Sequence, residues 1–216
     1  MKWSYSGLKD FVNCPKQYYE VKVAKNFVKE QTKQMLYGTE VHKALEDYAR
    51  DKTPLPQNYK RFQKVMDVVL EIPGIKYPER KFALTAEKLP CDFSDANYWV
   101  RGIVDLLIIE GTTAFVLDYK TGSAKYPDPK QLKLMALMTF AHHPNVERVR
   151  AGLLFVAHNH FLPEEYDRKD IEKLWSAFTP ELARMKVSYD TNNWPENPTG
   201  LCGWCPVVSC AFNRMD

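Results

Sequence analysis

Hydrophobic residues recur at helical spacing in two stretches of the first third of the chain. In residues 38–51 the apolar positions lie three or four residues apart, as in a helix with one buried face, and they are Val41, Ala44, Leu45 and Tyr48. Residues 58–71 repeat this spacing with Phe62, Val65, Met66 and Val69. The pattern therefore predicts two amphipathic helices. Three residues that disfavour helices follow them, namely Pro73, Gly74 and Pro78.

The middle of the chain changes to short apolar stretches that are typical of strands. We expect strands over residues 81–85, 99–109, 114–120 and 149–157. Helical patterns return at 129–141 and 167–186. Shorter helices are expected near the N-terminus, where Ser4 or Ser6 can cap one and Pro15 can open another. Helices followed by a small sheet and then by helix, strand and helix indicate a mixed α/β fold.

The length of 216 residues suits one domain with terminal embellishments. We expect an N-terminal helical segment over residues 1–35, a core over residues 36–187 and a C-terminal cysteine-rich segment over residues 188–216. The C-terminal segment contains prolines and glycine and is expected to be irregular.

Residues 102–122 form two apolar strands around a two-residue loop. Gly111 stands first in that loop, which is the position where a type II′ hairpin favours glycine. In the register that such a hairpin sets, Glu110 faces Thr113. The alternating apolar residues of both strands then share the opposite face, which we expect to be core: Val104, Leu106, Ile108, Phe115, Leu117 and Tyr119.

Two aspartates and a lysine share the other face in this register. Asp105 falls directly opposite Asp118, and Lys120 lies two residues further along the same side. Like charges so close within apolar strands repel each other, so a divalent cation between them makes the arrangement reasonable. Carboxylate oxygens suit Mg²⁺ or Mn²⁺, and a metal beside a lysine suits hydrolysis of phosphodiesters. The alternative is a sheet rim with solvated aspartates, one of them paired with Lys120.

Composition changes this picture little. The chain is 45% hydrophobic and 26% charged, as in ordinary globular proteins, and its net charge of +3 does not by itself indicate a nucleic-acid binder. No apolar run reaches the length needed to cross a bilayer, and the N-terminus turns polar at once without a signal peptide. We therefore expect the protein in the cytoplasm, or in the host cytoplasm if a phage encodes it.

Lysines and aromatic residues alternate in the N-terminal segment. Lysines neutralise phosphates and aromatic rings stack on bases, so this segment is a candidate for contacts with single-stranded DNA. The residues expected to make them are Lys9, Lys16, Tyr18 and Tyr19. The alternative is a solvated helix face above a buried aromatic stripe.

Asp105 followed by Asp118-Tyr119-Lys120 resembles the defining motif of the PD-(D/E)XK nuclease superfamily. The sequences Gly102-Ile-Val-Asp105 and Asp118-Tyr-Lys-Thr-Gly122 are particularly similar to its RecB-like branch. The resemblance implies a restriction-endonuclease-like core, with a small mixed β-sheet flanked by helices. It also implies a metal-dependent phosphodiesterase.

The resemblance adds residues to the candidate site. Gly38-Thr-Glu-Val-His42 matches the place of a helix histidine in the RecB-like branch. The implied metal ligands are His42, Asp105, Asp118 and the backbone carbonyl of Tyr119, and Lys120 is the implied catalytic lysine.

Three further positions lie around these ligands. Gln131 matches a catalytic glutamine that follows the lysine, whereas Met135 stands where the branch often has a tyrosine that positions substrate. Glu79 resembles an acidic position of the family, and the alternative for it is a solvated loop carboxylate.

The chain has five cysteines, and clustered cysteines in a reducing compartment suggest a metal or cluster rather than disulfides. Residues 3–15, which contain Cys14, resemble the opening of iron–sulfur RecB-like nucleases. These include the AddB nuclease domain and the CRISPR-associated adaptation exonucleases. Residues 202–210 resemble their closing element. The resemblance implies a [4Fe–4S] cluster on Cys14, Cys202, Cys205 and Cys210, which joins the two chain ends. Zn²⁺ at the same cysteines and unligated cysteines are the alternatives, and Cys91 is expected to be structural.

The function expected from these features is a metal-dependent DNA exonuclease. It would act on DNA ends, prefer single strands, and serve recombination, replication or CRISPR-type DNA processing. Two other classes remain open: a non-catalytic DNA-binding scaffold of the same fold, and a structure-selective endonuclease.

Overall fold

The computed structural model describes residues 1–123, 125 and 127–213. They form two compact units: unit 1 combines residues 1–32 with the chain from Ser176 onward, and unit 2 is Lys33–Trp175. The first boundary lies close to the expected one at residue 35, whereas the second precedes the expected one at residue 187. That the terminal segments belong to a single nuclease domain stays a prediction.

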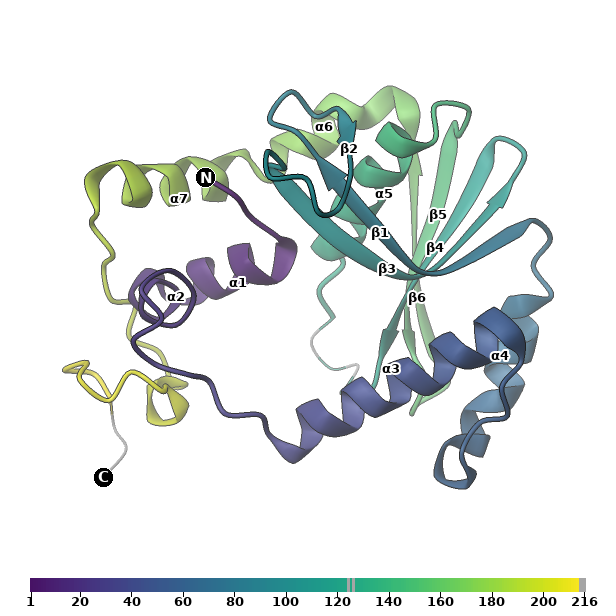
Figure 1. Ribbon diagram of the computed structural model, residues 1–216, viewed down its shortest axis with the longest axis horizontal. Helices are drawn as coiled ribbons and strands as arrows, with labels where there is room; N and C mark the ends of the chain where they lie inside the picture. Colours follow the sequence, from purple (N-terminus) through teal and green to yellow (C-terminus); the bar gives the residue numbers. More distant parts are fainter. Residues whose placement is uncertain (124, 126, 214–216) are drawn as a thin grey trace. The chain divides into compact units, whose positions relative to one another are not determined.

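A mixed sheet of six strands forms the centre of unit 2 within the described residues, in the order β2-β1-β3-β4-β5-β6 (Figure 1). The strands are β1 (Ile75–Leu84), β2 (Pro90–Cys91), β3 (Val100–Glu110), β4 (Thr113–Lys120), β5 (Arg148–Phe155) and β6 (His160–Asp167). Neighbouring strands are antiparallel except β4 and β5, which are parallel and are connected through helix α5 (Lys130–His142). This architecture confirms the expected α/β fold of the restriction-endonuclease type.

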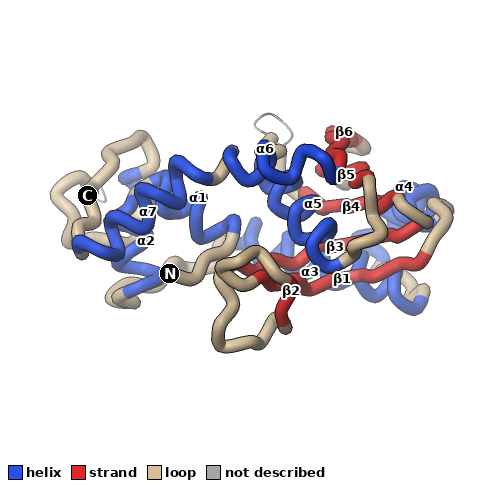
Figure 2. Tube along the Cα trace, turned by 90° about the horizontal axis from the view of Figure 1, so that it is seen from above, coloured by secondary structure: helices blue, strands red, loops and turns tan. Residues whose placement is uncertain are grey.

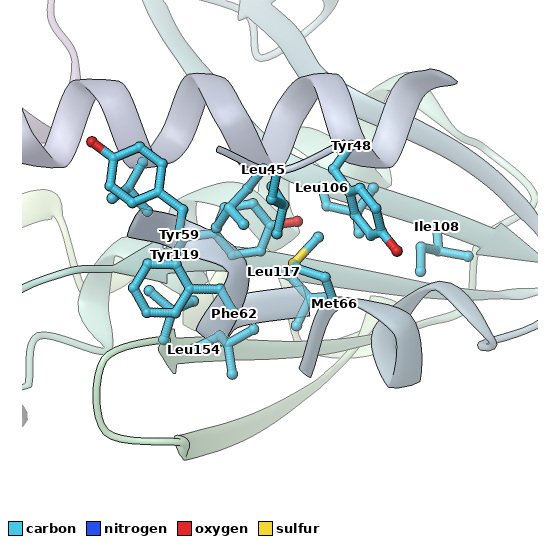
Figure 3. Close-up of a cluster of buried hydrophobic side chains, with 13 residues drawn as sticks. Leu45, Tyr48, Tyr59, Phe62, Met66, Leu106, Ile108, Leu117, Tyr119 and Leu154 are labelled. Atoms are coloured by element: carbon cyan, nitrogen blue, oxygen red, sulfur yellow. The ribbon is translucent and has the colours of Figure 1, made fainter. Parts of the chain in front are cut away.

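Helices α3 (Lys33–Asp51) and α4 (Gln63–Leu70) cover one face of the sheet. Their apolar side chains pack over β3, β4 and β5 in a cluster (Figure 3) that contains Val41, Leu45, Tyr48, Phe62, Met66, Leu106, Ile108, Leu117, Tyr119 and Leu154. The apolar stripe predicted for residues 38–51 is therefore confirmed, because it supplies the helix side of this core.

Helix α5 supplies a second layer. Leu107 and Val116 alternate along their strands with the residues of the first core, and both are fully buried, so a covering element is required on their side too. Helix α5 contacts β1, β3, β4 and β5, and most of its side chains are buried. Figure 2 shows it beside the strands. Both faces of the central strands are thus apolar, and a charged residue on either face needs a specific partner.

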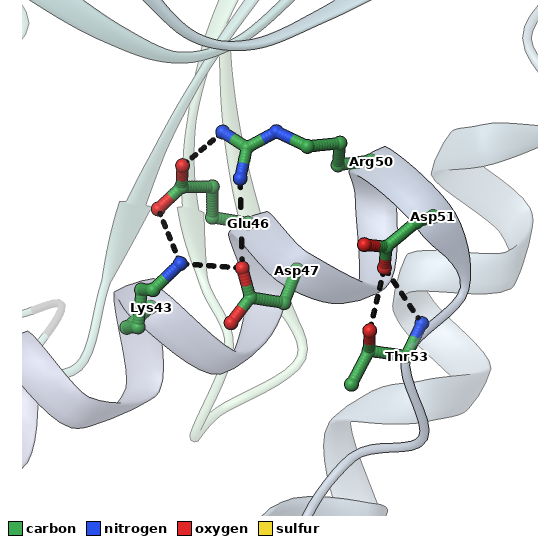
Figure 4. A network of polar contacts seen from close by, with 6 residues as sticks. All are labelled: Lys43, Glu46, Asp47, Arg50, Asp51 and Thr53. Carbon is green, nitrogen blue, oxygen red and sulfur yellow. Dashed lines mark hydrogen bonds and ion pairs between the residues drawn. The ribbon is translucent and has the colours of Figure 1, made fainter.

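The solvent side of α3 carries a network of charges (Figure 4). Lys43 lies 2.5 Å from Asp47 and 3.6 Å from Glu46, and Arg50 pairs with both acids. Exposed pairs of this kind contribute little to stability because water screens them, so the buried stripe dominates the stability of this helix. None of the described helices is long and apolar enough to cross a membrane.

Two predicted helices are interrupted in the structure. The helix expected over residues 58–71 begins as a 3-10 helix (Gln57–Phe62) before α4. The helix expected over residues 167–186 is divided into α6 (Ile171–Ser176) and α7 (Thr179–Thr191). Pro180 explains the second break, because it has no N–H to donate and its ring clashes with the carbonyl four residues earlier.

The sequence pattern underestimated the extent and the number of the strands. β1 begins at Ile75, six residues before the expected start at residue 81, and β6 was not anticipated. β6 is an edge strand with a single buried residue, Tyr166, and a proline, Pro163, so it lacks the apolar alternation by which strands are recognised. The other predicted strands are confirmed.

Unit 1 contains α1 (Tyr5–Asn13), α2 (Pro15–Tyr18), α7 and the C-terminal tail. The Ser4 hydroxyl accepts a hydrogen bond from the Gly7 N–H at 3.2 Å, which confirms the predicted cap of α1. Trp194 of the tail packs against four aromatic rings, those of Phe11, Tyr18, Tyr19 and Tyr189. The N-terminal and C-terminal parts of unit 1 therefore share one aromatic core.

Candidate metal centre

His42 is positioned by the buried stripe of α3. Val41 and Leu45 are fully buried, which turns the neighbouring His42 toward β3 and leaves its side chain 32% exposed. Its Nδ1 lies 3.3 Å from Oδ1 of Asp105. Burial lowers the pKa of His42, but the hydrogen bond and the charge of Asp105 outweigh it, and the net shift is upward. Helix α3 also approaches the end of β4 closely, since a Cβ on Gly38 would lie 3.3 Å from the Thr121 hydroxyl.

Asp105 joins this helix to the two central strands. The ladder between β3 and β4 begins at the predicted pair of Glu110 and Thr113 and ends at the pair of Leu106 and Leu117. It therefore stops one step before Asp105 and Asp118. In place of the next cross-strand pair, Oδ2 of Asp105 accepts a hydrogen bond from the backbone N–H of Tyr119 at 2.6 Å.

Glu79 completes a group of three possible ligands. It lies on β1 between residues that pair with Leu106 and Val104, which places it beside Asp105. One ligand atom each from His42, Glu79 and Asp105 lie within 4.8 Å of one another, and this is the one such group of His, Cys, Asp or Glu that the described residues form. Burial and then the charge of Asp105 raise the pKa of Glu79.

The backbone of Glu79 is strained. Its φ is +51°, in the left-handed region that costs a non-glycine residue about 1–3 kcal/mol and that is found preferentially at functional sites. The alternative of a solvated loop carboxylate does not describe this residue, because it is part of a strand and is half-buried.

Asp118 belongs to a second set of polar contacts, which it forms with Gln131 and Lys120. Its side chain is 5% exposed, and its Oδ1 accepts a hydrogen bond from Nε2 of Gln131 at 2.7 Å. The Lys120 ammonium donates to Oε1 of Gln131 at 3.0 Å and lies 2.6 Å from Oδ2 of Asp118. Burial and then the charge of Asp105 raise the pKa of Asp118 to about 6, against the influence of Lys120. The ion pair of the solvated-rim alternative is thus present, but the aspartate is buried.

The predicted site residues are therefore brought together in two linked sets. His42 and Asp105 meet as expected, and Glu79 joins them. Asp118, Lys120 and Gln131 form the second set, and Tyr119 links the two through its N–H. The direct opposition of Asp105 and Asp118 was expected from an ideal hairpin, but the pairing of β3 and β4 ends before it.

The donor chemistry of the first set fits a divalent cation. Two half-buried carboxylates and one imidazole are gathered there, and the charge of Asp105 adds to burial in raising the pKa of Glu79. Oxygen ligands suit Mg²⁺ and Mn²⁺, and an imidazole favours the softer of the two, Mn²⁺. The second set offers a further buried oxygen, Oδ2 of Asp118, which accepts no hydrogen bond of acceptable geometry within the described residues.

Four of the five cysteines lie around one cavity of unit 1. The cavity has a volume of about 220 Å³, and its lining includes Cys14, Cys202, Cys205 and Cys210. Three of the sulfurs accept hydrogen bonds: Cys14 from the Gln17 N–H, Cys205 from the Gln17 side chain and Cys202 from the Thr199 N–H, at 3.5, 3.5 and 3.3 Å. Cys91 lies in β2 of unit 2.

The predicted DNA contacts of the N-terminal segment have other partners in unit 1. Lys16 pairs with Glu196 at 2.8 Å, and Tyr19 stacks on Trp194 with 5.0 Å between ring centroids. Tyr18 is buried, and its hydroxyl lies 3.0 Å from that of Tyr189. The alternative of a buried aromatic stripe describes Tyr18, whereas Lys9 is exposed.

Comparison with known proteins places this chain in a family. The family model of the PD-(D/E)XK nuclease superfamily matches residues 2–210. The crystal structure of a candidate exonuclease from Eubacterium rectale is similar with a TM-score of 0.55 and 13% identity, over 94% of this chain and 86% of that one. The structure of SSO0001 is similar with a TM-score of 0.44 and 11% identity, over 98% of this chain and 87% of that one. Comparison with curated proteins finds no significant match. The match along nearly the whole chain shows that this protein belongs to the PD-(D/E)XK nuclease superfamily.

Proposed function

We propose that the protein is a divalent-metal-dependent DNA exonuclease whose active site is formed by the two linked sets of polar residues in unit 2. The observation that carries the proposal is the gathering of His42, Glu79 and Asp105 beside the buried contacts of Asp118. A site for hydrolysis without a metal would have little use for Asp105, whose charge raises the pKa values of both Glu79 and Asp118.

The cation, Mg²⁺ or Mn²⁺, would be held by His42, Glu79 and Asp105. Oδ2 of Asp118 and the backbone carbonyl of Tyr119 are the further ligands that we propose. When bound, the cation supplies a hydroxide at neutral pH and neutralises charge on the phosphate in the transition state. Glu79 and Asp105 bring the negative charge that attracts it, and His42 contributes a nitrogen whose ring is oriented by Asp105.

Lys120 would act on the substrate side of this site. Its ammonium is held between Oδ2 of Asp118 at 2.6 Å and Oε1 of Gln131 at 3.0 Å. A charged lysine held in one place orients a water molecule and stabilises developing negative charge without reorganising. Gln131 keeps both partners in position, because its amide donates to Asp118 and accepts from Lys120.

Action on DNA ends, with a preference for single strands, is the finer part of the proposal. It is supported by the resemblance of the motifs to RecB-like nucleases and by the similarity to the candidate exonuclease, which itself shows the fold alone. The proposed role is the processing of DNA ends in recombination, replication or CRISPR-type DNA capture.

The test compares linear and closed circular single-stranded DNA of one sequence, with Mg²⁺, Mn²⁺ or chelator. We expect the linear molecule to be degraded from its labelled end and the circle to resist. Rapid cutting of the circle would assign an endonuclease instead, and no cutting under any condition would favour the non-catalytic scaffold.

We also propose a [4Fe–4S] cluster on the four cysteines that line the cavity of unit 1. Tetrahedral zinc at about 2.3 Å from each thiolate requires sulfurs about 3.8 Å apart. Among the described residues, however, no three of these sulfurs lie within 4.8 Å of one another. The wider spacing and the cavity of about 220 Å³ suit a cluster better than a single ion.

Hydrogen bonds around the cavity support the same proposal. Donors directed at sulfur stabilise thiolates and tune clusters, and Gln17 directs one N–H to Cys14 and another to Cys205. It thereby links the N-terminal cysteine to the C-terminal ones.

Iron analysis of protein purified without oxygen tests the cluster. We expect brown protein with about four irons per chain. Cys14→Ser should lose iron and lower the unfolding temperature, whereas Cys91→Ser, the matched control in unit 2, should do neither. Colourless protein with one zinc per chain would replace the cluster with zinc and leave the nuclease proposal intact.

A further inference from the structure

Two cations near the candidate metal centre have no carboxylate partner among the described residues. Lys81 of β1 and Arg101 of β3 are exposed, and neither forms an ion pair with any residue that the structure describes. Lys81 is two residues from Glu79 along β1, and Arg101 is four residues from Asp105 along β3.

The strand register places the two cations on one face of β1 and β3. Lys81 is paired with Ile103, and directly opposed residues point to the same side. Along β3, Arg101 and Ile103 are two residues apart and therefore share that side, whereas the alternation does not continue past Asp105, because Leu106 packs on the α3 side and Gly102 faces α5. Ile103 is 38% exposed, so it adds apolar surface between the two cations.

Phe82 and Gly102, which alternate with the cations along the two strands, show which face of the sheet the cations occupy. The ring of Phe82 lies 4.7 Å from that of His142 on α5, and a Cβ on Gly102 would lie 3.2 Å from the sulfur of Met138 on α5. Lys81, Ile103 and Arg101 alternate with these residues and so point away from α5. That is the side on which His42 of α3 meets Asp105.

Two aromatic rings fix the cations without neutralising them. The Lys81 ammonium lies 5.6 Å from the ring centroid of Phe93. The Arg101 guanidinium lies 5.1 Å from the centroid of Phe93 and 4.7 Å from that of Tyr98. A guanidinium held against rings keeps its charge and its planar set of donors, so less conformational entropy is lost when it binds a phosphate.

We propose that Lys81, Phe93, Tyr98, Arg101 and Ile103, here called the β1–β3 strip, bind the backbone of single-stranded nucleic acid on one side of the phosphodiester that is cleaved. The proposal rests on the proposed nuclease function, because it identifies where the substrate of that site lies. Asp105 and Arg101 are four residues apart on one strand, roughly 13 Å at 3.3 Å per residue. The strip therefore contacts phosphates a few nucleotides from the cleavage point.

Arg150 provides a matched control on the same sheet. Its guanidinium also lies over a ring, 6.0 Å from the centroid of Phe115, but it is paired with Glu165 at 3.3 Å. It therefore has the same chemistry as Arg101, with its charge already compensated.

The test measures binding of a labelled 20-nucleotide single strand as a function of salt, in protein carrying Asp118→Asn to prevent cleavage. Adding Lys81→Gln and Arg101→Gln should weaken binding about tenfold or more. It should also reduce the slope of log affinity against log salt by roughly 1.4, since each phosphate contact contributes about 0.7. Arg150→Gln should change neither quantity, and Arg101→Lys should restore part of the slope.

A second measurement uses the active enzyme and separates this proposal from the proposed function. The Lys81→Gln, Arg101→Gln variant should lose more kcat/KM on the 20-nucleotide strand than on a dinucleotide, which does not reach Arg101. Unchanged affinity and salt slope in the double variant would overturn the proposed role of the β1–β3 strip. A loss of affinity for duplex DNA alone, with binding of the single strand unchanged, would overturn it too. Absence of cleavage by the wild-type protein would overturn the nuclease function. The binding measurement on the double variant would still show whether the β1–β3 strip binds single-stranded nucleic acid.

Discussion

Oδ2 of Asp105 accepts a hydrogen bond from the backbone N–H of Tyr119 at 2.6 Å, and Tyr119 is the residue between Asp118 and Lys120. The carboxylate thus takes over the pairing of β3 and β4 where their ladder ends. Its other oxygen faces His42. One side chain therefore holds the end of a strand and contributes to the metal centre.

Substitutions of Asp105 should separate these two tasks. Asp105→Asn keeps an oxygen that can accept from Tyr119 but loses the charge, so activity should fall at least about 100-fold with little loss of stability. Asp105→Ala should in addition lower the free energy of unfolding by about 1–3 kcal/mol, because the Tyr119 N–H loses its acceptor. Urea unfolding and cleavage assays on both variants measure this, and an Asn variant of normal activity would refute the metal role.

Glu79 should govern metal affinity. Glu79→Gln should raise the metal concentration for half-maximal activity by about 10- to 100-fold, because it removes one charge from the ligand group. Glu165→Gln is the matched control, since Glu165 lies on β6 and pairs with Arg148 and Arg150 outside that group. Equal metal dependence of the two variants would remove Glu79 from the site.

Gln131 should act through the residues that it holds. Gln131→Leu removes the donor to Asp118 and the acceptor of Lys120, so turnover should drop by about 10- to 100-fold. The metal requirement should change little, since Gln131 touches none of the three grouped ligands. A Gln131→Leu variant with wild-type turnover, measured at saturating metal, would show that the lysine needs no positioning.

Without metal, the protein should become less stable as pH rises. The pKa values of Asp118, Glu79 and His42 are all raised in the folded state, so folding favours their protonated forms. That contribution is complete at low pH and is lost as pH rises through the folded pKa values, which for Asp118 is about 6. In chelator, the unfolding temperature should therefore fall between pH 5 and pH 8, and Mn²⁺ should restore it most at the higher pH.

The same series with Asp118→Asn checks the origin of this effect. The amide has no proton to lose, so the fall in unfolding temperature should be smaller in that variant. A slope as steep as that of the wild-type protein would place the titration elsewhere.

The parts of the fold that sequence predicts well are those with strong periodicity. The stripe of α3 and the hairpin of β3 and β4 were predictable because burial imposes spacing on apolar residues. β6 and the start of β1 were not, since an edge strand or a strand interrupted by Pro78 lacks that signal. The end of the β3–β4 ladder was also missed, because an ideal hairpin register does not show where strands separate.

The candidate site divides in the same way. His42, Asp105, Asp118, Lys120 and Gln131 were predicted from motifs, and each contacts at least one other member in the structure. Whether Glu79 belongs to the site could not be judged from the sequence, because its position beside Asp105 depends on the pairing of β1 with β3 and on a left-handed backbone. Trp194 was overlooked as well: a tryptophan in a proline-rich tail gives no hint that four rings converge on it.

The most direct test of the account is cleavage of end-labelled linear single-stranded DNA by the wild-type protein and by Asp118→Asn, each with Mn²⁺ and with chelator. We predict degradation by the wild-type protein with Mn²⁺ alone, and a loss of at least about 100-fold in Asp118→Asn, which retains the fold. Equal cleavage by both proteins, or cleavage by the wild-type protein that persists in chelator, would contradict a metal-dependent nuclease site at Asp118.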